Sequence, residues 1–250
     1  MRFFIRLSYK GTAFHGWQIQ QNATPTVQAE LNAALTTVLG ETIDITGAGR
    51  TDTGVHACNY IAHFDSEKLI ATDNLSTIVY HLNGLLPNDI AVHALAVMHD
   101  KAHARFDAVE RTYKYYIDTC KNPFTFDYAA FFPYDFDMGK MNDAAKLLFD
   151  YRDFTSFAKL HTDTKTNDCR IMQAYWEKQN GQLIFTITAD RFLRDMVRAI
   201  VGTLINVGRG KVTVTDFQRI IEQKNRCASG ASVPAKGLCL EAISYPYVVP

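Results

Sequence analysis

An arginine and an aspartate separated by one residue have the clearest chemical potential of any side chains in this chain. They are Arg50 and Asp52, in the glycine-bounded segment 47–54, Gly-Ala-Gly-Arg-Thr-Asp-Thr-Gly. Glycine permits backbone conformations and close approaches that other residues resist, and loops held on a rigid scaffold often display catalytic groups. A nearby guanidinium keeps a carboxylate ionised and oriented, as a nucleophile or a base requires. Asp52 is therefore the first candidate for chemistry.

Three interpretations of this segment compete. In the simplest, Asp52 caps backbone donors in a hairpin turn and Arg50 is its ion-pair partner. In the second, residues 52–54 are the Asp-Thr-Gly of an aspartic protease, whose two carboxylates share one proton. That chemistry needs a second such loop, and the chain has no other copy, so it would need a symmetric dimer. In the third, Asp52 is a lone nucleophile or base with a cation beside it, and the rest of the chain favours this one.

Composition places the chain among ordinary globular proteins, with 47% apolar and 21% charged residues. Its 250 residues suffice for one large domain or two modest ones. We find no apolar run of the ~18 residues that a membrane span needs, and no signal-peptide core near the N-terminus. The five cysteines are scattered without a Cys-x-x-Cys pair. We therefore expect reduced thiols in a cytoplasmic protein, with neither a disulfide framework nor a metal site.

Charge is unevenly distributed, although the net charge is zero. A neutral chain is not a general binder of polyanions. Residues 191–226, however, contain eight Lys and Arg residues against three Asp and Glu residues. Solvated helix faces explain such a bias in many proteins, but a concentrated basic surface also suits a nucleic-acid groove.

Periodicity predicts alternating helices and strands. Strands are expected at residues 3–9 and 43–46. Between them we expect a helix with Thr24 as its N-cap and Pro25 as its first residue, ending at Gly40. Its buried face would contain Val27, Leu31, Ala34, Leu35 and Val38. Further helices are expected at 75–85, 137–149, 192–207 and 214–224, further strands at 90–97, 111–118 and 238–245, and a hairpin of strands 171–178 and 182–189 around Asn180-Gly181.

These elements predict an α+β fold with mostly antiparallel sheets. Each half of the chain would contain strands accompanied by roughly two helices. The polar segment that follows residue 98 suggests a boundary near residues 99–107. We therefore expect two domains, 1–102 with the Asp52 loop and 103–250 completing the site.

An ordered set of short motifs spans nearly the whole chain. The motifs are residues 9–18 (Tyr-Lys-Gly-Thr-Ala-Phe-His-Gly-Trp-Gln), 26–28, 49–57, 83–87, 103–108, 111–115, 153–157, 192–198 with Gly202, and 237–240. In this order the chain resembles the TruA family of tRNA pseudouridine synthases. It departs from the usual family pattern at Lys10 and at Arg194-Asp195, neither of which touches the Asp52 loop.

The resemblance implies a fold of two similar α/β domains, whose mostly antiparallel sheets are flanked by helices, with a basic cleft between the domains. It further implies a homodimer, without metal or organic cofactor, that isomerises uridine to pseudouridine in the anticodon arm of tRNA at positions 38, 39 and 40. Asp52 would be the catalytic carboxylate, Arg198 would hold it, and Tyr113 would stack on the extruded base. His56 would support the turn. The expected RNA contacts are Tyr113, Arg50, Arg105, Lys114 and Arg194, with Lys10 and Arg191 as further phosphate contacts.

Two other functions remain open at this point. An RNA-binding or RNA-chaperone module would use Asp52 only as a turn residue. A dimeric aspartic hydrolase would be indifferent to tRNA. Individual residues also have ordinary alternatives, since Tyr113 can be a core aromatic and Arg198 a surface cation. Phe14 and Trp17 are expected to be structural.

Overall fold

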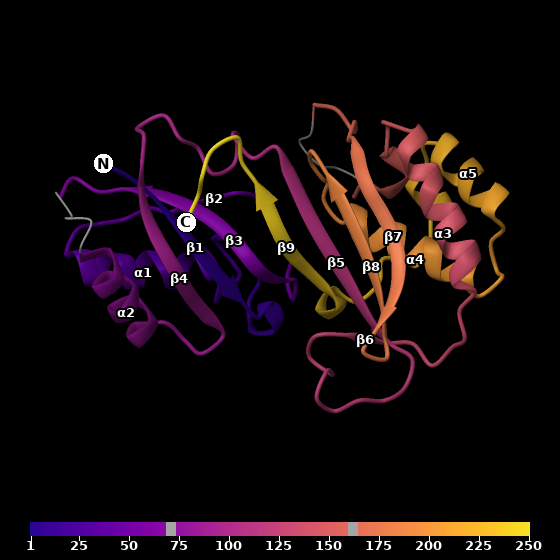
Figure 1. Cartoon of the computed structure of the whole chain (residues 1–250), viewed down its shortest axis with the longest axis horizontal. Coiled ribbons are helices and arrows are strands. Elements are labelled where there is room, and N and C mark those ends of the chain that lie inside the picture. Colours follow the sequence, from indigo (N-terminus) through magenta and orange to yellow (C-terminus); the bar gives the residue numbers. More distant parts are fainter. Residues whose placement is uncertain (69–73, 160–164) are drawn as a thin grey trace. The chain divides into compact units, whose positions relative to one another are not determined.

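The chain folds into two compact units, as the computed structural model in Figure 1 shows. The structure describes residues 1–68, 74–159 and 165–250. Unit 1 consists of residues 1–109 and 240–250, and unit 2 of residues 110–239. Strands and helices are combined with mostly antiparallel pairing, which confirms the predicted α+β class.

Unit 1 is built on an antiparallel sheet. Its central strand β1 (Arg2–Tyr9) pairs with β3 (His56–Asp65) on one side and with β4 (Ile90–Met98) on the other. The short β2 (Thr46–Gly47) pairs with β3. The helices α1 (Val27–Leu39) and α2 (Leu75–Leu85) lie together on one face of these strands (Figure 1). The sheet therefore holds both ends of the segment that contains Asp52.

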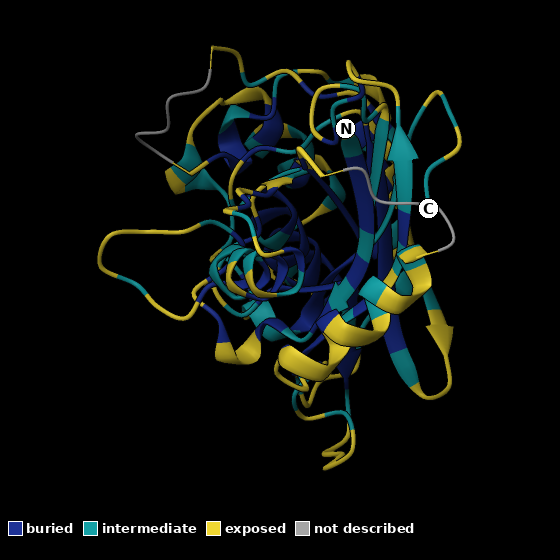
Figure 2. Ribbon diagram, turned by 90° about the vertical axis from the view of Figure 1, so that its left-hand side faces the viewer, coloured by how far each residue is buried: buried dark blue, intermediate teal, exposed yellow. Residues whose placement is uncertain are grey.

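Unit 2 has a second antiparallel arrangement, in the order β5 (Glu110–Asp118), β8 (Gln182–Ala189) and β7 (Ile171–Gln179). The two-residue strand β6 (Ala130–Phe131) runs parallel to β5. Its helices are α3 (Met138–Lys146), α4 (Met196–Gly208) and α5 (Val214–Glu222), and β9 (Leu238–Ser244) carries the chain from unit 2 into unit 1. The strands β1, β3 and β8 are buried over most of their length, whereas β4, β5, β7 and β9 are partly exposed. Figure 2 shows much of the remaining exposure in loops and on outer helix faces. None of the described helices has the length and apolar character needed to cross a membrane.

The predicted start of α1 is wrong by two residues. Thr26, not Thr24, is the N-cap, and its hydroxyl accepts a hydrogen bond from the Ala29 amide at 3.4 Å. Val27 is accordingly the first helical residue, and Gly40 ends the helix with φ of 63° as predicted. Thr24 and Thr26 are equally good caps by residue type, so the sequence did not separate them.

The predicted strand at 43–46 is also largely wrong, since β2 begins only at Thr46. The preceding backbone bonds to side chains of α1 instead of to a neighbouring strand. The Ile45 amide donates to Asn32 Oδ1 at 2.9 Å, and the Ile45 carbonyl accepts from Gln28 Nε2 at 2.8 Å. These contacts satisfy the backbone without a ladder, while Ile43 and Ile45 stay buried.

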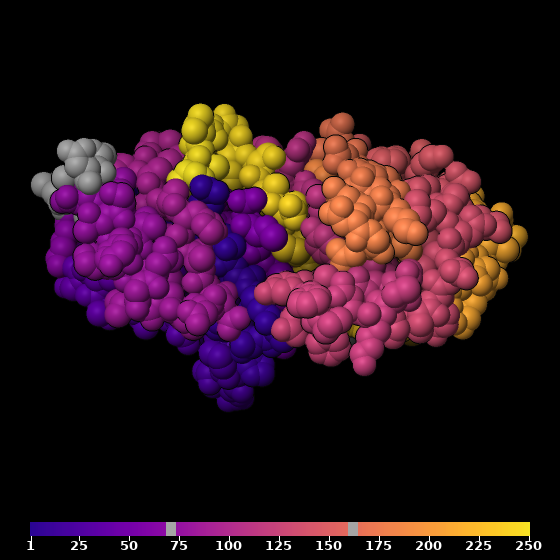
Figure 3. All heavy atoms as spheres, turned by 60° about the horizontal axis from the view of Figure 1, so that its bottom comes forward, coloured from indigo at the N-terminus to yellow at the C-terminus, as the bar shows by residue number. Residues whose placement is uncertain are grey.

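The compact units differ from the predicted ranges, 1–102 and 103–250, in residues 103–109 and 240–250. Hydrogen bonds join these two segments within unit 1. The Val109 amide donates to the Ser244 carbonyl at 2.9 Å, and the Tyr247 hydroxyl donates to Asp107 at 2.7 Å. Figure 3 shows the last residues, in yellow, lying against the indigo and purple surface of unit 1. Pairing between segments more than 100 residues apart leaves no local signal in the sequence.

A buried histidine stabilises this pairing in a pH-dependent way. His63 on β3 is 5% exposed and its Nδ1 accepts a hydrogen bond from the Ala104 amide at 3.2 Å. Its ring lies against Phe4 and His103. Burial, aided by the positive charge of His103 and Arg2, lowers the pKa of His63 to about 4. The folded protein therefore resists protonation of this ring.

We expect unit 1 to lose stability as the pH falls from about 6.5 to about 4. In this range the unfolded His63 binds a proton and the folded one does not, so the free energy of unfolding decreases by up to about 3 kcal/mol. The variant His63→Asn keeps an acceptor near the Nδ1 position and should show a smaller difference between unfolding at pH 7 and pH 4.5. The exposed His81→Asn serves as control, and an unchanged pH dependence in His63→Asn would contradict this account.

Candidate active site

Asp52 occupies the first position of a β-turn that leads into β3. The Val55 amide donates to the Asp52 carbonyl at 3.1 Å, and Gly54 has φ of 80°, as the third residue of a type II turn requires. Asp52 is half-buried, whereas Arg50 and Thr53 are exposed. The turn therefore presents the carboxylate near the surface on a backbone of fixed shape.

Residues 9–18, here called the platform, pack against the backbone of the turn at two glycines. A Cβ atom on Gly11 would lie 2.0 Å from the Val55 carbonyl oxygen, and one on Gly16 would lie 2.4 Å from the Thr51 carbonyl oxygen. Gly16 also has φ of 86°. The Trp17 amide donates to the same Thr51 carbonyl at 3.3 Å. The platform and the turn are thus in backbone contact, which only glycine permits here.

Three aromatic rings hold the segment that precedes Asp52. Trp17 stacks on Tyr60 with ring centroids 4.1 Å apart, and the Tyr60 hydroxyl donates to the Gly49 carbonyl. The Tyr9 hydroxyl and Thr51 Oγ1 are hydrogen-bonded at 2.8 Å in a buried position. Phe14 and Trp17 are buried, consistent with the structural role expected for them.

His56 connects the turn to the platform. It is 4% exposed, and its Nδ1 accepts a hydrogen bond from the Gly11 amide at 3.0 Å. Because the amide is the donor, this nitrogen carries no proton. The contact matches the supporting role predicted for His56.

Tyr113 and Arg198, the other two predicted catalytic residues, both lie in unit 2. Tyr113 lies on β5 opposite Ile187 and is half-buried, with its ring edge-to-face against Phe192 at 5.2 Å. Tyr115 shares its face of the strand but is fully buried and donates to the Pro234 carbonyl at 2.8 Å. Burial raises the pKa of the Tyr115 hydroxyl. Of the two tyrosines, Tyr113 is therefore the one with accessible surface.

Arg198 projects from the first turn of α4. Its Nε donates to the Val233 carbonyl at 2.7 Å, and its Nη1 pairs with Asp195 Oδ1 at 3.1 Å. The predicted helix start at 192 is wrong, because Asp195 adopts the left-handed conformation, with φ of 65°, and α4 begins at Met196. The partners of Arg198 were not predicted from the sequence. The i,i+3 spacing of Asp195 and Arg198 was the available signal.

The predicted RNA contacts are divided between the units. Arg50 and Arg105 are exposed residues of unit 1, and the Arg105 guanidinium lies 5.8 Å from the Phe106 ring centroid. Lys114 is half-buried on β5, and Arg194 is exposed before α4. Lys10 and Arg191 are half-buried. Arg50 thus lies on the same loop as Asp52, while Tyr113, Lys114, Arg194 and Arg198 all belong to unit 2.

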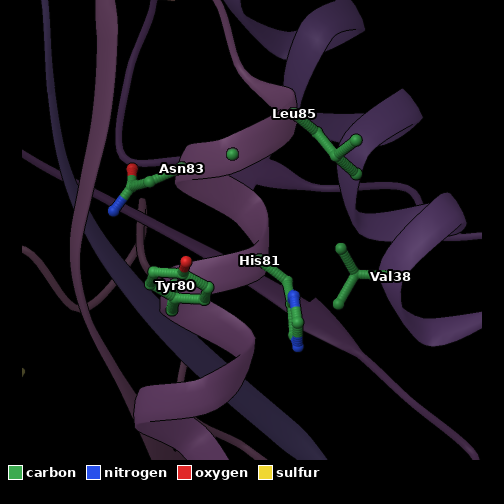
Figure 4. A pocket seen from close by; sticks show the side chains of 6 residues that line it. Val38, Tyr80, His81, Asn83 and Leu85 are labelled. Atoms are coloured by element: carbon green, nitrogen blue, oxygen red, sulfur yellow. The ribbon is translucent and has the colours of Figure 1, made fainter.

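A cavity of about 610 Å³ lies elsewhere in unit 1, between α1 and α2 (Figure 4). It contains none of the predicted site residues. In Figure 4, His81 of α2 points toward Val38 of α1 across the opening. The lining residues are Val38, Tyr80, His81, Asn83, Gly84 and Leu85. Within either unit taken separately, the described residues bring no three His, Cys, Asp or Glu side chains within metal-binding distance.

Comparison with known proteins identifies a family for the whole chain. A sequence model of the tRNA pseudouridine synthase family matches residues 7–107 and 144–246. A tRNA pseudouridine synthase A from Bacteroides thetaiotaomicron is 52% identical over 248 residues, covering 98% of this chain and 91% of that protein. The Parabacteroides distasonis protein of the same name is also 52% identical, covering 98% and 96%. The one from Bacillus subtilis is 38% identical, covering 98% and 99%.

Proposed function

Since this chain belongs to the tRNA pseudouridine synthase family, and is therefore an isomerase that acts on uridine in tRNA, we propose that it acts in the anticodon arm, at positions 38, 39 and 40, with Asp52 as its catalytic carboxylate. The observation that carries the proposal is the construction of the Asp52 turn. Backbone and side-chain contacts with residues 9–17 hold it, which is how a scaffold fixes a reacting group.

The reaction is an isomerisation that needs no co-reactant. The bond between N1 of the base and C1′ of the ribose breaks, the base turns over, and a bond forms between C5 and C1′. C5 then loses its proton and N1 gains one, so that product and substrate have the same composition. An ionised carboxylate can assist as a nucleophile or by promoting elimination at the sugar. Either route requires Asp52 to be charged and correctly aimed.

We assign the remaining roles to side chains of both units. Arg198 would hold the Asp52 carboxylate through a charge-assisted hydrogen bond. Tyr113 would stack on the uracil after it leaves the helical stack, offsetting an unstacking cost of a few kcal/mol. Arg50, Arg105, Lys114 and Arg194 would contact phosphates, which supply most of the affinity for RNA. The working form would be a cytoplasmic homodimer.

The direct test is incubation of the purified chain with an unmodified tRNA transcript, without added cofactor or metal, followed by mapping of pseudouridine. We expect the signal only at positions 38, 39 and 40. Tight binding without any pseudouridine would instead indicate an RNA-binding module. Signal outside the anticodon arm would retain the enzyme class and reject the proposed site.

Tyr113→Phe separates stacking from proton transfer. The variant keeps the ring and its edge-to-face contact with Phe192, so we expect the Kd for tRNA to be unchanged. Loss of the hydroxyl should lower kcat by about 10²-fold if the phenol assists proton loss from C5. Single-turnover rates measure this effect, with the surface residue Tyr175→Phe as control. A full rate in Tyr113→Phe would restrict Tyr113 to stacking.

A further inference from the structure

A cluster of four polar side chains surrounds the start of α4. Its members are Asp195, Arg198, Arg226 and Ser232, here called the Asp195 cluster. We propose that Asp195 is a positioning residue for the reaction, setting the place of the Arg198 guanidinium. The inference rests on the proposed function only in the role that it gives to Arg198.

The Asp195 carboxylate is bound on both of its oxygens. Oδ1 pairs with Arg198 Nη1 at 3.1 Å, while Oδ2 accepts a hydrogen bond from the Ser232 hydroxyl and lies 3.6 Å from Arg226 Nη2. Arg226 Nη2 also donates to Ser232 Oγ at 2.9 Å. The carboxylate is therefore the shared partner of two guanidinium groups.

Arg198 is fixed to the facing segment by a second route. Its Nε donates to the Val233 carbonyl, and the Val233 amide donates to the Arg198 carbonyl at 3.3 Å. That segment lies directly on α4, because a Cβ atom on Gly202 would be only 2.0 Å from the Ala231 carbonyl oxygen. The Arg198 guanidinium is thus held at two of its nitrogens. Val233 binds Nε, and Asp195 binds Nη1.

The charged side chains of the Asp195 cluster are only slightly exposed to solvent, which helps their contacts to hold a fixed geometry. The side chains of Asp195, Arg198 and Arg226 are 16%, 21% and 19% exposed. Ion pairs that are partly withdrawn from water hold their geometry better than exposed ones. The three charged groups together carry one positive charge, so the cluster as a whole still attracts a further anion.

The conformation of Asp195 is poorly explained by helix stability alone. An aspartate at an N-cap normally accepts a hydrogen bond from the helix's own amides, but the Asp195 side chain does not. It also adopts the left-handed conformation, which costs roughly 1–2 kcal/mol for residues other than glycine and is best tolerated by Asn and Asp. The carboxylate is bound to the side chains of Arg198 and Ser232 instead of to the backbone amides of α4, as expected for a positioning role.

The test is the Asp195→Asn variant. Asparagine tolerates the same backbone conformation but cannot pair ionically with two arginines. We expect kcat to fall by about 10- to 100-fold, as small misplacement of a catalytic group does, with the KM and Kd for tRNA unchanged. The matched control is Asp216→Asn. Asp216 forms an i,i+3 pair with Arg219 at 3.2 Å on α5, away from this cluster, and its replacement should leave kcat unchanged.

A double-mutant cycle with Arg198→Lys identifies the route of the effect. If Asp195 acts through Arg198, Asp195→Asn lowers the single-turnover rate of the wild type but not that of Arg198→Lys. An equal fall in both backgrounds, or an unchanged kcat in Asp195→Asn, would overturn the inference. A fully active Arg198→Lys would instead refute the proposed role of Arg198, so the two failures are distinct.

Ser232→Ala keeps the test decisive if Asp195→Asn folds poorly. It removes the hydrogen bond to Oδ2 and the one from Arg226 Nη2, and leaves all charges in place. We expect a smaller fall in kcat, of about threefold to tenfold, in a variant that stays folded. A wild-type kcat in a folded Ser232→Ala variant would count against positioning through the Asp195 cluster.

Discussion

In the Asp52→Asn variant we expect pseudouridine formation to fall by roughly 10⁴-fold or more, because loss of a catalytic nucleophile or base has effects of this order. Asparagine has the same shape, and the hydrogen bond from the Val55 amide goes to the Asp52 backbone carbonyl. The turn should therefore survive, and the melting temperature and the Kd for tRNA should stay near their wild-type values. Single-turnover kinetics on unmodified transcript measures the rate.

The control for Asp52 is Asp44→Asn. Asp44 is an exposed aspartate of the same unit, and its carboxylate accepts a hydrogen bond from Asn32 at 3.1 Å. Its replacement should leave the rate unchanged. Comparable pseudouridine yields from the Asp52 and Asp44 variants would show that Asp52 is a turn residue only.

Gly16→Ala should cause a large loss of stability through a single methyl group near the site. Left-handed backbone costs alanine roughly 1–2 kcal/mol. The clash with the Thr51 carbonyl, at 2.4 Å, adds about 1–3 kcal/mol, as overpacking does. Because Thr51 precedes Asp52, relief of the clash also moves the carboxylate, and kcat should fall by about 10²-fold.

Gly181→Ala provides the matched comparison for Gly16→Ala. Gly181 has nearly the same φ, 83° against 86°, but a Cβ atom there would meet nothing within 4 Å. It should therefore show only the conformational cost and retain full activity. Thermal melting and single-turnover rates of the two variants separate the cost of the left-handed backbone from the cost of the clash between the added methyl group and its neighbours. Equal melting temperatures would contradict the close packing described beneath the Asp52 turn.

Much of the fold was predictable because its signals are local. The Asn180-Gly181 turn joins β7 and β8 as expected, with both turn residues at positive φ. The apolar spacing in α1 correctly identified Val27, Leu31, Ala34 and Leu35 as buried, while Val38 lies at the cavity beside α2. The first residues of the helices were less predictable, since the start of a helix depends on a cap or on the φ angle of one residue, as at Thr26 and Asp195.

The candidate site divides in the same way. The composition of the Asp52 loop was sufficient to single out its carboxylate, because two residue types and flanking glycines lie within eight positions. The support beneath it was not apparent, since Gly11, Gly16 and Tyr60 meet the loop only after the chain has folded. The Asp195 cluster depends on residues 226–233 returning to α4, a contact that sequence spacing does not encode.

Unit 1 is assembled from two separate segments of the chain, which has a consequence for synthesis on the ribosome. Unit 1 contains residues 240–250 in addition to residues 1–109, so its contacts cannot all form until translation has passed residue 239. Unit 2 is continuous and all of its residues emerge earlier. The segment that presents Asp52 is made before unit 2, yet the unit that contains it is completed after unit 2. A nascent chain therefore carries that loop on an unfinished fold while unit 2 is being synthesised.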